Sequence, residues 1–272
     1  MISSYSPKSV TSSSDASLDR FSEALLKTPV PLDEAAFALS AHCQDRPLQL
    51  EVGLGSLDEL ASRVITPSFV GVATLLFDEL GFAGDNLDYF NPRNSYLEHV
   101  LESRIGIPIS LAVVMMEVCR RCDVEACGIG MPGHFLVGDK QDANQLLDPF
   151  RGKIITPEDA EKLFAYLNPS AEFRPEFLEE TSSDAILSRM LNNLRLVHVK
   201  RKSTEDLIRV LDLMVCWNSP PLGEVKQLAA ALDSLGRTDQ AARRLEEIAG
   251  RTTGDAKQRI HSLSTQFWRR LN

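Results

Sequence analysis

The spacing of hydrophobic residues changes twice along the chain. From the end of a Ser-rich leader to about residue 80, and again from about Ser183 onward, apolar positions recur with the period of amphipathic helices. Ser56 and Glu59 stand three residues apart ahead of an apolar run, which predicts a capping box at a helix start. The run from Ser68 to Leu80 ends at Gly81, a common helix stop. Both outer parts of the chain are therefore predicted to be helical.

The middle of the chain has a mixed pattern. We expect a short helix near Ser95–Ser103, followed by a breaker at Gly106. The residues from Pro108 to Cys122 are apolar nearly all round, which predicts a helix inside the domain, and proline suits its first turn. Three short runs predict strands at Val124–Ile129, His134–Val137 and Gln145–Leu147. After them, Thr156, Pro157, Glu158 and Asp159 have the order of an N-cap, a first-turn proline and acids that suit a helix start.

A spacing of 34 residues recurs in the last third of the chain. Two comparable helix starts, Lys202–Leu207 and Gly236–Ala241, lie 34 residues apart, and Leu211 with Leu245 and Leu194 with Leu228 keep that offset. This is the length of a tetratricopeptide helix–turn–helix repeat. The alternative is that two helical hairpins of similar size share the offset by chance. Because two repeats and a final helix (Gly254–Leu271) fall short of the usual three repeats, we expect this tail to pack on the rest of the chain.

Together these elements predict an α+β fold that is mostly helical, with a small antiparallel sheet followed by an all-α tail. We expect a disordered leader over residues 1–17, a core with N-terminal helices over residues 18–175, and the helical tail over residues 182–272. Charge supports two parts with different surfaces. Residues 1–150 hold 10 Lys and Arg against 21 Asp and Glu, whereas residues 151–272 hold 19 against 17.

Composition excludes several classes of function. The 272 residues carry a formal net charge of −9, which argues against nucleic acid as a partner. In the apolar middle, the longest uncharged stretch runs from Ile105 to Met116 and is too short to span a bilayer, so no membrane role is expected. The leader has no apolar region typical of a secretory signal, and five cysteines do not make a disulfide framework. We therefore expect a cytoplasmic protein.

His134 and Asp148 form the pair with the most chemical potential. If the hairpin between them is centred on Gln141, the two side chains lie opposite each other on one face of the sheet. The aspartate can then accept the Nδ1–H of the imidazole and orient it as a base. The alternative is that each residue makes separate local bonds, since a register slip of one residue places them on opposite faces.

At this point the sequence resembles a known family. The segments GFAGDNLDYFNPRNSYL, GIPISLAVVMMEVCRR, GIGMPGHFLV and LLDPFRG, together with Ile186–Leu194, resemble the transglutaminase-like core of the bacterial SirB-type regulators of sirC expression, which carry a tetratricopeptide tail. The resemblance covers roughly residues 20–250. It implies a papain/transglutaminase-like fold in which the N-terminus of a central helix faces a small sheet. It also places His134 and Asp148 where active relatives carry those catalytic partners.

The same resemblance shows what is missing. Active relatives carry a cysteine at the start of the central helix, a place that falls at or near Pro108, where neither Pro108 nor its neighbours is cysteine. Cys119 lies roughly 16 Å further along the helix. Ser110 is the only hydroxyl in the right turn. It is either a nucleophile within reach of His134 or, as we favour, a polar first-turn residue bonded to nearby backbone.

Other candidates are weaker. Cys119, Cys122, Cys127 and His134 have a spacing that superficially suits zinc, but the first two lie on a buried helix, so no metal and no cofactor is predicted.

Arg93, Asn94 and Pro108 are possible residues of a cleft, with Arg93 as an anion contact; the favoured alternative is that Asn94 or Ser95 caps the next helix. Lys200–Lys202 suits a helix C-terminus, with a basic docking patch as the alternative.

Two functions follow from different classes of protein. The first is a non-catalytic interaction or regulatory module that binds a protein partner through its helical tail, with room for a peptide or small ligand in the core cleft. The second is a hydrolase or acyl-transfer enzyme that uses Ser110, or a water activated by His134, with Asp148 as the orienting group. The empty cysteine position favours the first.

Overall fold

Three helices come first in the chain and pack side by side. They are α1 (Ser13–Leu25), α2 (Leu32–Cys43) and α3 (Leu50–Ser62). The computed structural model describes residues 13–271, with side chains from Ala16 onward. The predicted leader is therefore wrong for residues 13–17, which belong to α1, and its remainder lies outside the described residues.

The capping box expected at Ser56 and Glu59 is absent, because α3 begins six residues earlier, at Leu50. The Ser56 hydroxyl instead donates to the Val52 carbonyl, 3.0 Å away, inside the helix. Further on, Ser68 caps the short helix α4 (Phe69–Ala73), which continues as a π-helical segment (Thr74–Glu79) and stops before Gly81 in a left-handed conformation. The predicted stop at Gly81 is confirmed.

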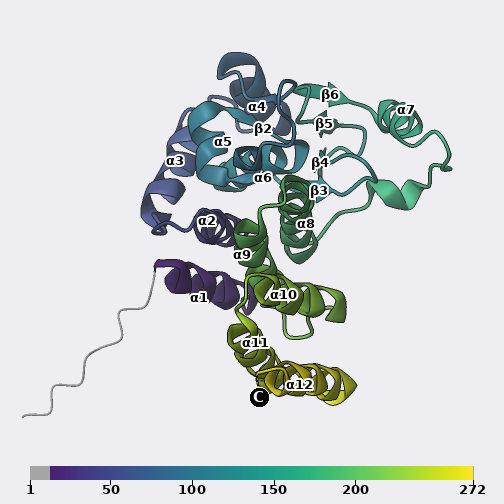
Figure 1. Cartoon of the computed structure of the whole chain (residues 1–272). Helices are drawn as coiled ribbons and strands as arrows, with labels where there is room; N and C mark the ends of the chain where they lie inside the picture. The colour runs from purple at the N-terminus through teal and green to yellow at the C-terminus, as the bar shows by residue number, and fades with distance from the viewer. Residues whose placement is uncertain (1–12, 272) are drawn as a thin grey trace, which may run out of the picture.

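The central helix of the fold is α6 (Pro108–Arg121), which is surrounded by other elements, as Figure 1 shows. Nearly every residue of its first ten is buried, as its uniformly apolar sequence predicts. Around it lie α2, α3, α5 (Leu97–Ser103) and a two-stranded parallel pairing of β1 (Ala83–Gly84) with β2 (Ile105–Gly106). The short helix ends at Ser103 with Arg104 in a left-handed conformation, ahead of the breaker expected at Gly106.

A four-stranded antiparallel sheet packs beside α6. Its order is β3 (Ala126–Ile129), β4 (Leu136–Asp139), β5 (Leu146–Asp148) and β6 (Lys153–Ile155), of which β6 was not predicted. The predicted register is wrong by two residues, since Val137 pairs with Leu147. The cause is local. The Asp142 side chain accepts from the backbone N–H of Asn144 at 3.0 Å, which shifts the centre of the turn from Gln141 to Asp142.

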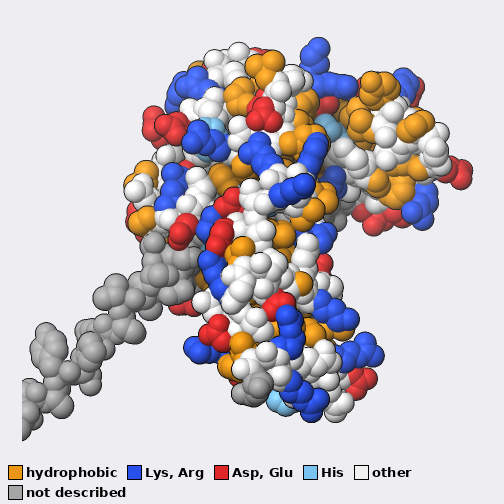
Figure 2. Space-filling view, viewed as in Figure 1, with side chains coloured by type: hydrophobic (Ala, Val, Ile, Leu, Met, Phe, Trp, Pro, Cys, Tyr) orange, Lys and Arg blue, Asp and Glu red, His pale blue; other side chains and the backbone are white. Residues whose placement is uncertain are grey.

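A small second core lies on the far face of this sheet. Thr156 caps α7 (Pro157–Leu167) in a reciprocal pair with Asp159, as the sequence predicts. Phe164 of α7 packs against the rings of Phe173 and Phe177, the latter in a short 3₁₀ helix (Pro175–Leu178). Figure 2 shows hydrophobic side chains at the surface of this part of the molecule.

The rest of the chain is helical. It comprises α8 (Ser183–Arg201), α9 (Thr204–Met214), α10 (Leu222–Ser234), α11 (Thr238–Arg251) and α12 (Gly254–Arg269). The starts of α9 and α11 lie 34 residues apart, and the four leucines that share this offset are buried. Two hairpins of matching length are thus present, whereas the tetratricopeptide assignment stays a prediction. The basic end of α8 closes the helix, as expected, with Lys202 in a left-handed conformation.

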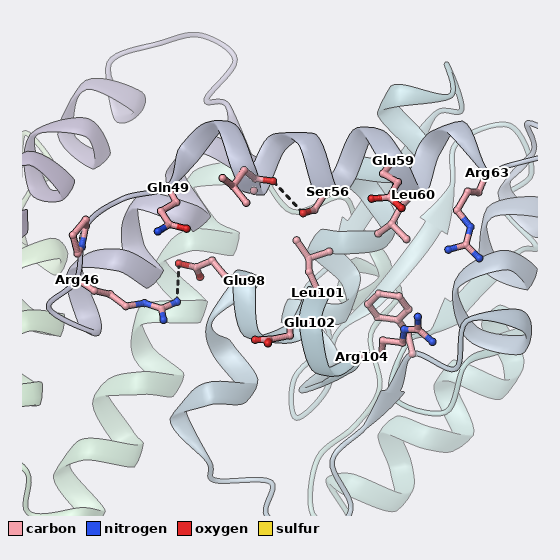
Figure 3. Close-up of a pocket in the computed structure, with 14 residues that line it drawn as sticks. Arg46, Gln49, Ser56, Glu59, Leu60, Arg63, Glu98, Leu101, Glu102 and Arg104 are labelled. Carbon is pink, nitrogen blue, oxygen red and sulfur yellow. Dashed lines mark hydrogen bonds and ion pairs between the residues drawn. The ribbon is translucent and has the colours of Figure 1, made fainter.

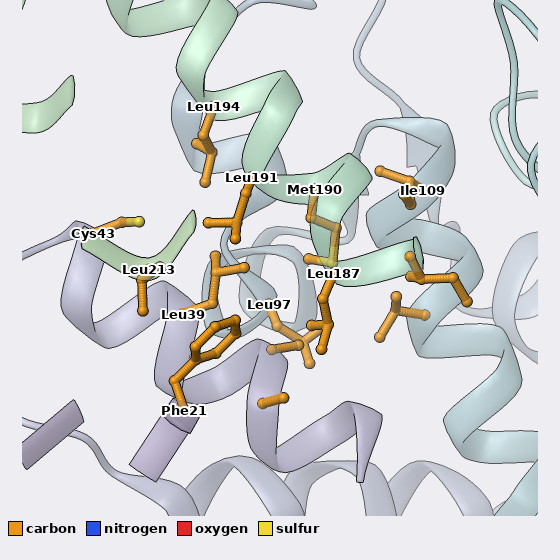
Figure 4. Packing of buried hydrophobic residues seen from close by; sticks show 14 of the residues in the cluster. Phe21, Leu39, Cys43, Leu97, Ile109, Leu187, Met190, Leu191, Leu194 and Leu213 are labelled. Carbon is orange, nitrogen blue, oxygen red and sulfur yellow. The ribbon is translucent and has the colours of Figure 1, made fainter. Parts of the chain in front are cut away.

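One hydrophobic core runs through both parts of the chain, from Phe21 to Phe267. Figure 4 shows Leu187 and Leu191 of α8 packed toward residues from the N-terminal helices and from α5 and α6. The helical tail therefore packs on the rest of the chain, as its small number of repeats predicts.

A buried ion-pair network ties α6 to α2 and α3. The guanidinium of Arg121 contacts Asp33 at 2.7 Å, Asp58 at 2.6 Å and Glu117 at 2.8 Å. Burial opposes ionisation of Asp33, yet the hydrogen bond from Arg121 holds the pKa of that carboxyl below its usual value. Burial and the neighbouring Asp33 charge raise the pKa of Glu117. Arg121 therefore compensates two buried carboxylates at once.

Replacing this arginine should destabilise the fold. Arg121→Ala leaves Asp33 and Glu117 short of positive charge, so we expect the free energy of unfolding to fall by about 3 kcal/mol. Urea denaturation of the full chain measures it. The control is Arg120→Ala, because Arg120 contacts the same two acids but its side chain is 60% exposed, and its loss should cost less than about 1 kcal/mol. Equal midpoints for the two variants would contradict the assignment.

Candidate functional site

His134 and Asp148 meet in the structure, as the sequence predicts. The Nε2 atom of His134 lies 2.8 Å from Oδ1 of Asp148. The side chain of Asp148 is 1% exposed and that of His134 is 11% exposed. The carboxylate is thus sealed from water, while an edge of the imidazole reaches the surface.

The route by which the two side chains meet differs from the prediction in two ways. His134 lies before β4, in a turn where its N–H donates to the Met131 carbonyl, rather than on the strand opposite Asp148. The ring must therefore reach across diagonally, and it presents its distal nitrogen, Nε2, where Nδ1 was expected. A register shift of two residues keeps both side chains on the same face, which is why the pair survives the error.

Asp148 is held as a carboxylate by its surroundings. Its Oδ1 also accepts from the backbone N–H groups of Phe150, at 3.0 Å, and Arg151, at 3.3 Å. Burial alone would raise the pKa of this carboxyl, but the hydrogen bond and charge of His134, followed by Arg151, hold it below its usual value. The arrangement keeps the acceptor charged and fixed against the imidazole.

The start of α6 holds no nucleophile. Ile107 is its N-cap residue and Pro108 its first residue. Ser110 is fully buried, and its hydroxyl donates to the Asn94 carbonyl at 2.6 Å and accepts from the Ile107 N–H at 3.1 Å. Both roles of this hydroxyl are satisfied by backbone groups. This is the favoured sequence interpretation of Ser110, and it leaves the hydroxyl proton directed away from the imidazole.

Asn94 and Pro108 do not line an open cleft, because both are buried. The amide of Asn94 donates to Asp85 and to the Asp88 carbonyl, each at 2.9 Å, which fastens the loop before α5. Arg93, by contrast, is exposed.

The expectation that Asn94 or Ser95 caps α5 is wrong. The N–H of Leu97 is met instead by the hydroxyl of Ser40 from α2, at 2.9 Å.

The cysteines of the described residues are poor nucleophiles and ligands. Cys119 is fully buried on α6, and burial raises the pKa of its thiol to about 12. Burial also raises the pKa of Cys122 and Cys127. Within residues 13–271 no cluster of three or more His, Cys, Asp or Glu side chains has the geometry to hold a metal ion.

Arg189 is the residue of this region that the sequence analysis missed. Extending from α8, its guanidinium donates to the backbone carbonyls of Met131 at 2.9 Å and His134 at 2.5 Å. It also lies over the ring of Phe135, 5.4 Å from the ring centre. The turn that carries the histidine is therefore held by a side chain from the tail. Arg189 falls within a segment noted only for its family resemblance, and no spacing distinguishes it.

The other end of α8 contacts the loop before α5. The ammonium of Lys200 lies 4.1 Å from the centre of the Phe90 ring, and Arg201 lies 3.7 Å from Asp88. Tyr89 of the same loop packs on Phe150, two residues after Asp148. One helix of the tail thus contacts both segments that flank the His134–Asp148 pair.

A buried central helix, an antiparallel sheet beside it and a His–Asp pair at the sheet define a transglutaminase-like core. The chain belongs to the transglutaminase-like superfamily, whose family model matches residues 56–192.

Curated relatives share this part of the chain. The UPF0162 protein of Xylella fastidiosa (strain 9a5c) is 42% identical over 118 residues, covering 43% of this chain and 39% of that protein. The UPF0162 protein PA3419 of Pseudomonas aeruginosa is 40% identical over 121 residues, covering 44% of each. F-box only protein 21 of Mus musculus is 31% identical over 146 residues, covering 50% of this chain and 22% of that protein.

The chain spans about two fifths of the length of the first two relatives. No solved structure matches it significantly. Among the described helices, none combines the length and the hydropathy needed to traverse a bilayer.

Removing His134 should expose the balance of forces on Asp148. In His134→Ala the main groups that lower the pKa of Asp148 are gone while burial persists, so this pKa should rise. NMR titration of the side-chain carboxyl carbon of Asp148 measures the shift, with His99→Ala as the control. In the wild type the folded pKa is the lower one, so stability from the pair is complete above the unfolded pKa and is lost as pH falls through the folded pKa. An unchanged pKa in His134→Ala would contradict the pairing.

Proposed function

We propose that this protein is a non-catalytic interaction or regulatory module of the cytoplasm, built on a transglutaminase-like core. The observation that carries the proposal is the start of α6. No cysteine is present there, and the nearest hydroxyl, that of Ser110, is bonded on both sides to backbone groups. A base and its orienting carboxylate are in place without a nucleophile for them to activate.

The other cysteines do not replace the missing one. Cys119 lies on the last turns of α6 and has a thiol pKa of about 12, so it is protonated at neutral pH. Cys43 is buried on α2, and burial raises the pKa of its thiol strongly. Thiol chemistry of the transglutaminase type has no starting point in these groups.

The helical tail offers a surface for a partner. A groove of about 490 Å³ lies where α9, α10 and α11 meet α1 and α2. Residues with both charge signs line it, namely Leu18, His42, Asp45, Glu205, Ile208, Arg209, Asp212, Leu232, Arg237, Gln240 and Arg244. Concave surfaces between repeated helices commonly hold extended protein segments. The paired charges on this lining favour a polar protein segment over an apolar one.

A second candidate function is hydrolysis by a water that His134 activates. The observation in its favour is the intact contact between Nε2 of His134 and Asp148, which leaves the other ring nitrogen free of that bond. The variant that uses Ser110 as nucleophile is less well supported, because the hydroxyl proton is given to the Asn94 carbonyl.

The partner surface can be tested on the full chain. Gln240 is exposed within the groove, so Gln240→Trp should fill it and weaken a partner isolated on the wild type at least tenfold in Kd, about 1.4 kcal/mol. Arg243→Trp is the control on the same helix, because Arg243 is exposed but does not line the groove. Titration calorimetry with the purified partner measures both. Equal affinities would remove the groove from the proposal.

Enzymatic activity can be tested separately. Assays with a p-nitrophenyl ester and with an anilide peptide should give the same rates for the wild type and for His134→Ala, since the module is non-catalytic. If His134→Ala abolishes a measurable turnover, the hydrolase takes the place of the module. Ser110→Ala then distinguishes the two hydrolases, because only a serine nucleophile is lost with it.

A further inference from the structure

A pocket of about 620 Å³ lies between α3 and α5, and it shares no lining residue with the His134–Asp148 pair. Figure 3 shows its lining residues descending from α3 on one side and rising from α5 and the segment after it on the other. Its size lies in the range of pockets that hold small ligands.

The charges of the lining are separated along the pocket. Figure 3 shows Arg46 at one end, Glu98 and Glu102 in the middle, Glu59 next, and Arg63 and Arg104 together at the far end. Positive and negative side chains are equal in number, so the pocket is neutral as a whole and strongly polar along its length. A ligand that matches this pattern carries opposite charges on its two ends.

The far end suits a carboxylate. Arg63 follows the last residue of α3 and, among the described residues, has no ion-pair partner. Arg104 is held in place by its left-handed backbone and by one hydrogen bond from Nη1 to the Leu80 carbonyl at 2.8 Å, which leaves the rest of its guanidinium for another acceptor. Two arginines from opposite walls converging on one place form a common recognition site for a carboxylate.

The middle of the pocket suits a cation. Glu102 and Glu59 face it from opposite walls and have no ion-pair partner in the part of the chain that the structure describes. Glu98 is ion-paired with Arg46 through Oε1 at 3.6 Å, while its buried Oε2 has no hydrogen-bond partner. Burial raises the pKa of Glu98, so a cation placed nearby would stabilise its charged form.

Apolar groups line the space between the charges. Leu60 of α3 faces Leu101 of α5, and Phe82 lies beside the arginine end. Side chains of a bound ligand that extend between the two ends would therefore contact hydrocarbon, which adds affinity through removal of apolar surface from water.

We propose that this pocket binds a short apolar peptide with free ends. The carboxylate lies between Arg63 and Arg104, the apolar side chains lie on Leu60, Leu101 and Phe82, and the ammonium lies beside Glu102, with Glu59 and Glu98 contributing negative charge. This function is separate from the partner groove on the tail, so its failure and that of the proposed module can be told apart.

Calorimetry with tri-leucine tests the proposal on the full chain. We expect saturable binding of tri-leucine, and at least tenfold weaker binding of its C-terminal amide and of its N-acetyl form, because each modification removes one of the two charges. Absence of saturable binding by tri-leucine, or equal binding of all three peptides, would overturn the proposal.

Two variants assign the ends. Arg63→Gln should weaken tri-leucine and remove its advantage over the amide, while Glu102→Gln should remove its advantage over the N-acetyl form. Arg243→Gln, a neutralised arginine on α11 far along the chain, is the control and should leave all three affinities unchanged. All three altered residues are exposed, and thermal melting checks that the variants fold. If Arg63→Gln and Glu102→Gln retain wild-type preferences, the peptide does not lie in this pocket.

Discussion

Burial of α6 is the constraint on which the rest of the structure depends. A helix that is apolar on nearly every side must be enclosed, and here α2, α3, α5, α8 and the sheet supply the walls. Enclosure brings its polar ends under tight control. Ser110 satisfies the first turn with the backbone of a neighbouring loop, and Arg121 satisfies the last turn with carboxylates of α2 and α3. The positions of the loop, the sheet and the His134–Asp148 pair all follow from how this helix is covered.

The pair itself shows how a catalytic arrangement can persist without its nucleophile. Asp148 is buried, hydrogen-bonded by two backbone N–H groups and kept ionised beside an imidazole. These contacts also fasten β5 to the turn before β4, so the pair has a structural value that does not depend on chemistry. A site can therefore keep its geometry for reasons of stability after one component has been replaced.

Local sequence signals were sufficient where the chain interacts with itself over a few residues. The proline at the start of α6, the Thr156 cap and the stop at Gly81 are of this kind, and so is the approximate position of each strand of the hairpin.

What the sequence could not supply is the partner of a group from a distant element. The cap of α5 comes from Ser40, 57 residues away from Leu97, and no pattern near α5 indicates it. The clamp that Arg189 forms on the His134 turn is also long-range, since the two residues are 55 positions apart. The register error has the opposite origin, a turn centre moved one residue by the side chain of Asp142.

The shared core gives the molecule a property that neither of its parts has alone. Leu187, Met190, Leu191 and Leu194 of α8 are buried among residues contributed by the first half of the chain, so this helix is a wall of the core that encloses α6. Separating the chain ahead of α8 would open that wall to water and release the turn that carries His134. The unit that melts cooperatively is then the whole assembly of helices and sheet, and a protease would meet no weakly attached tail to remove as an intact piece.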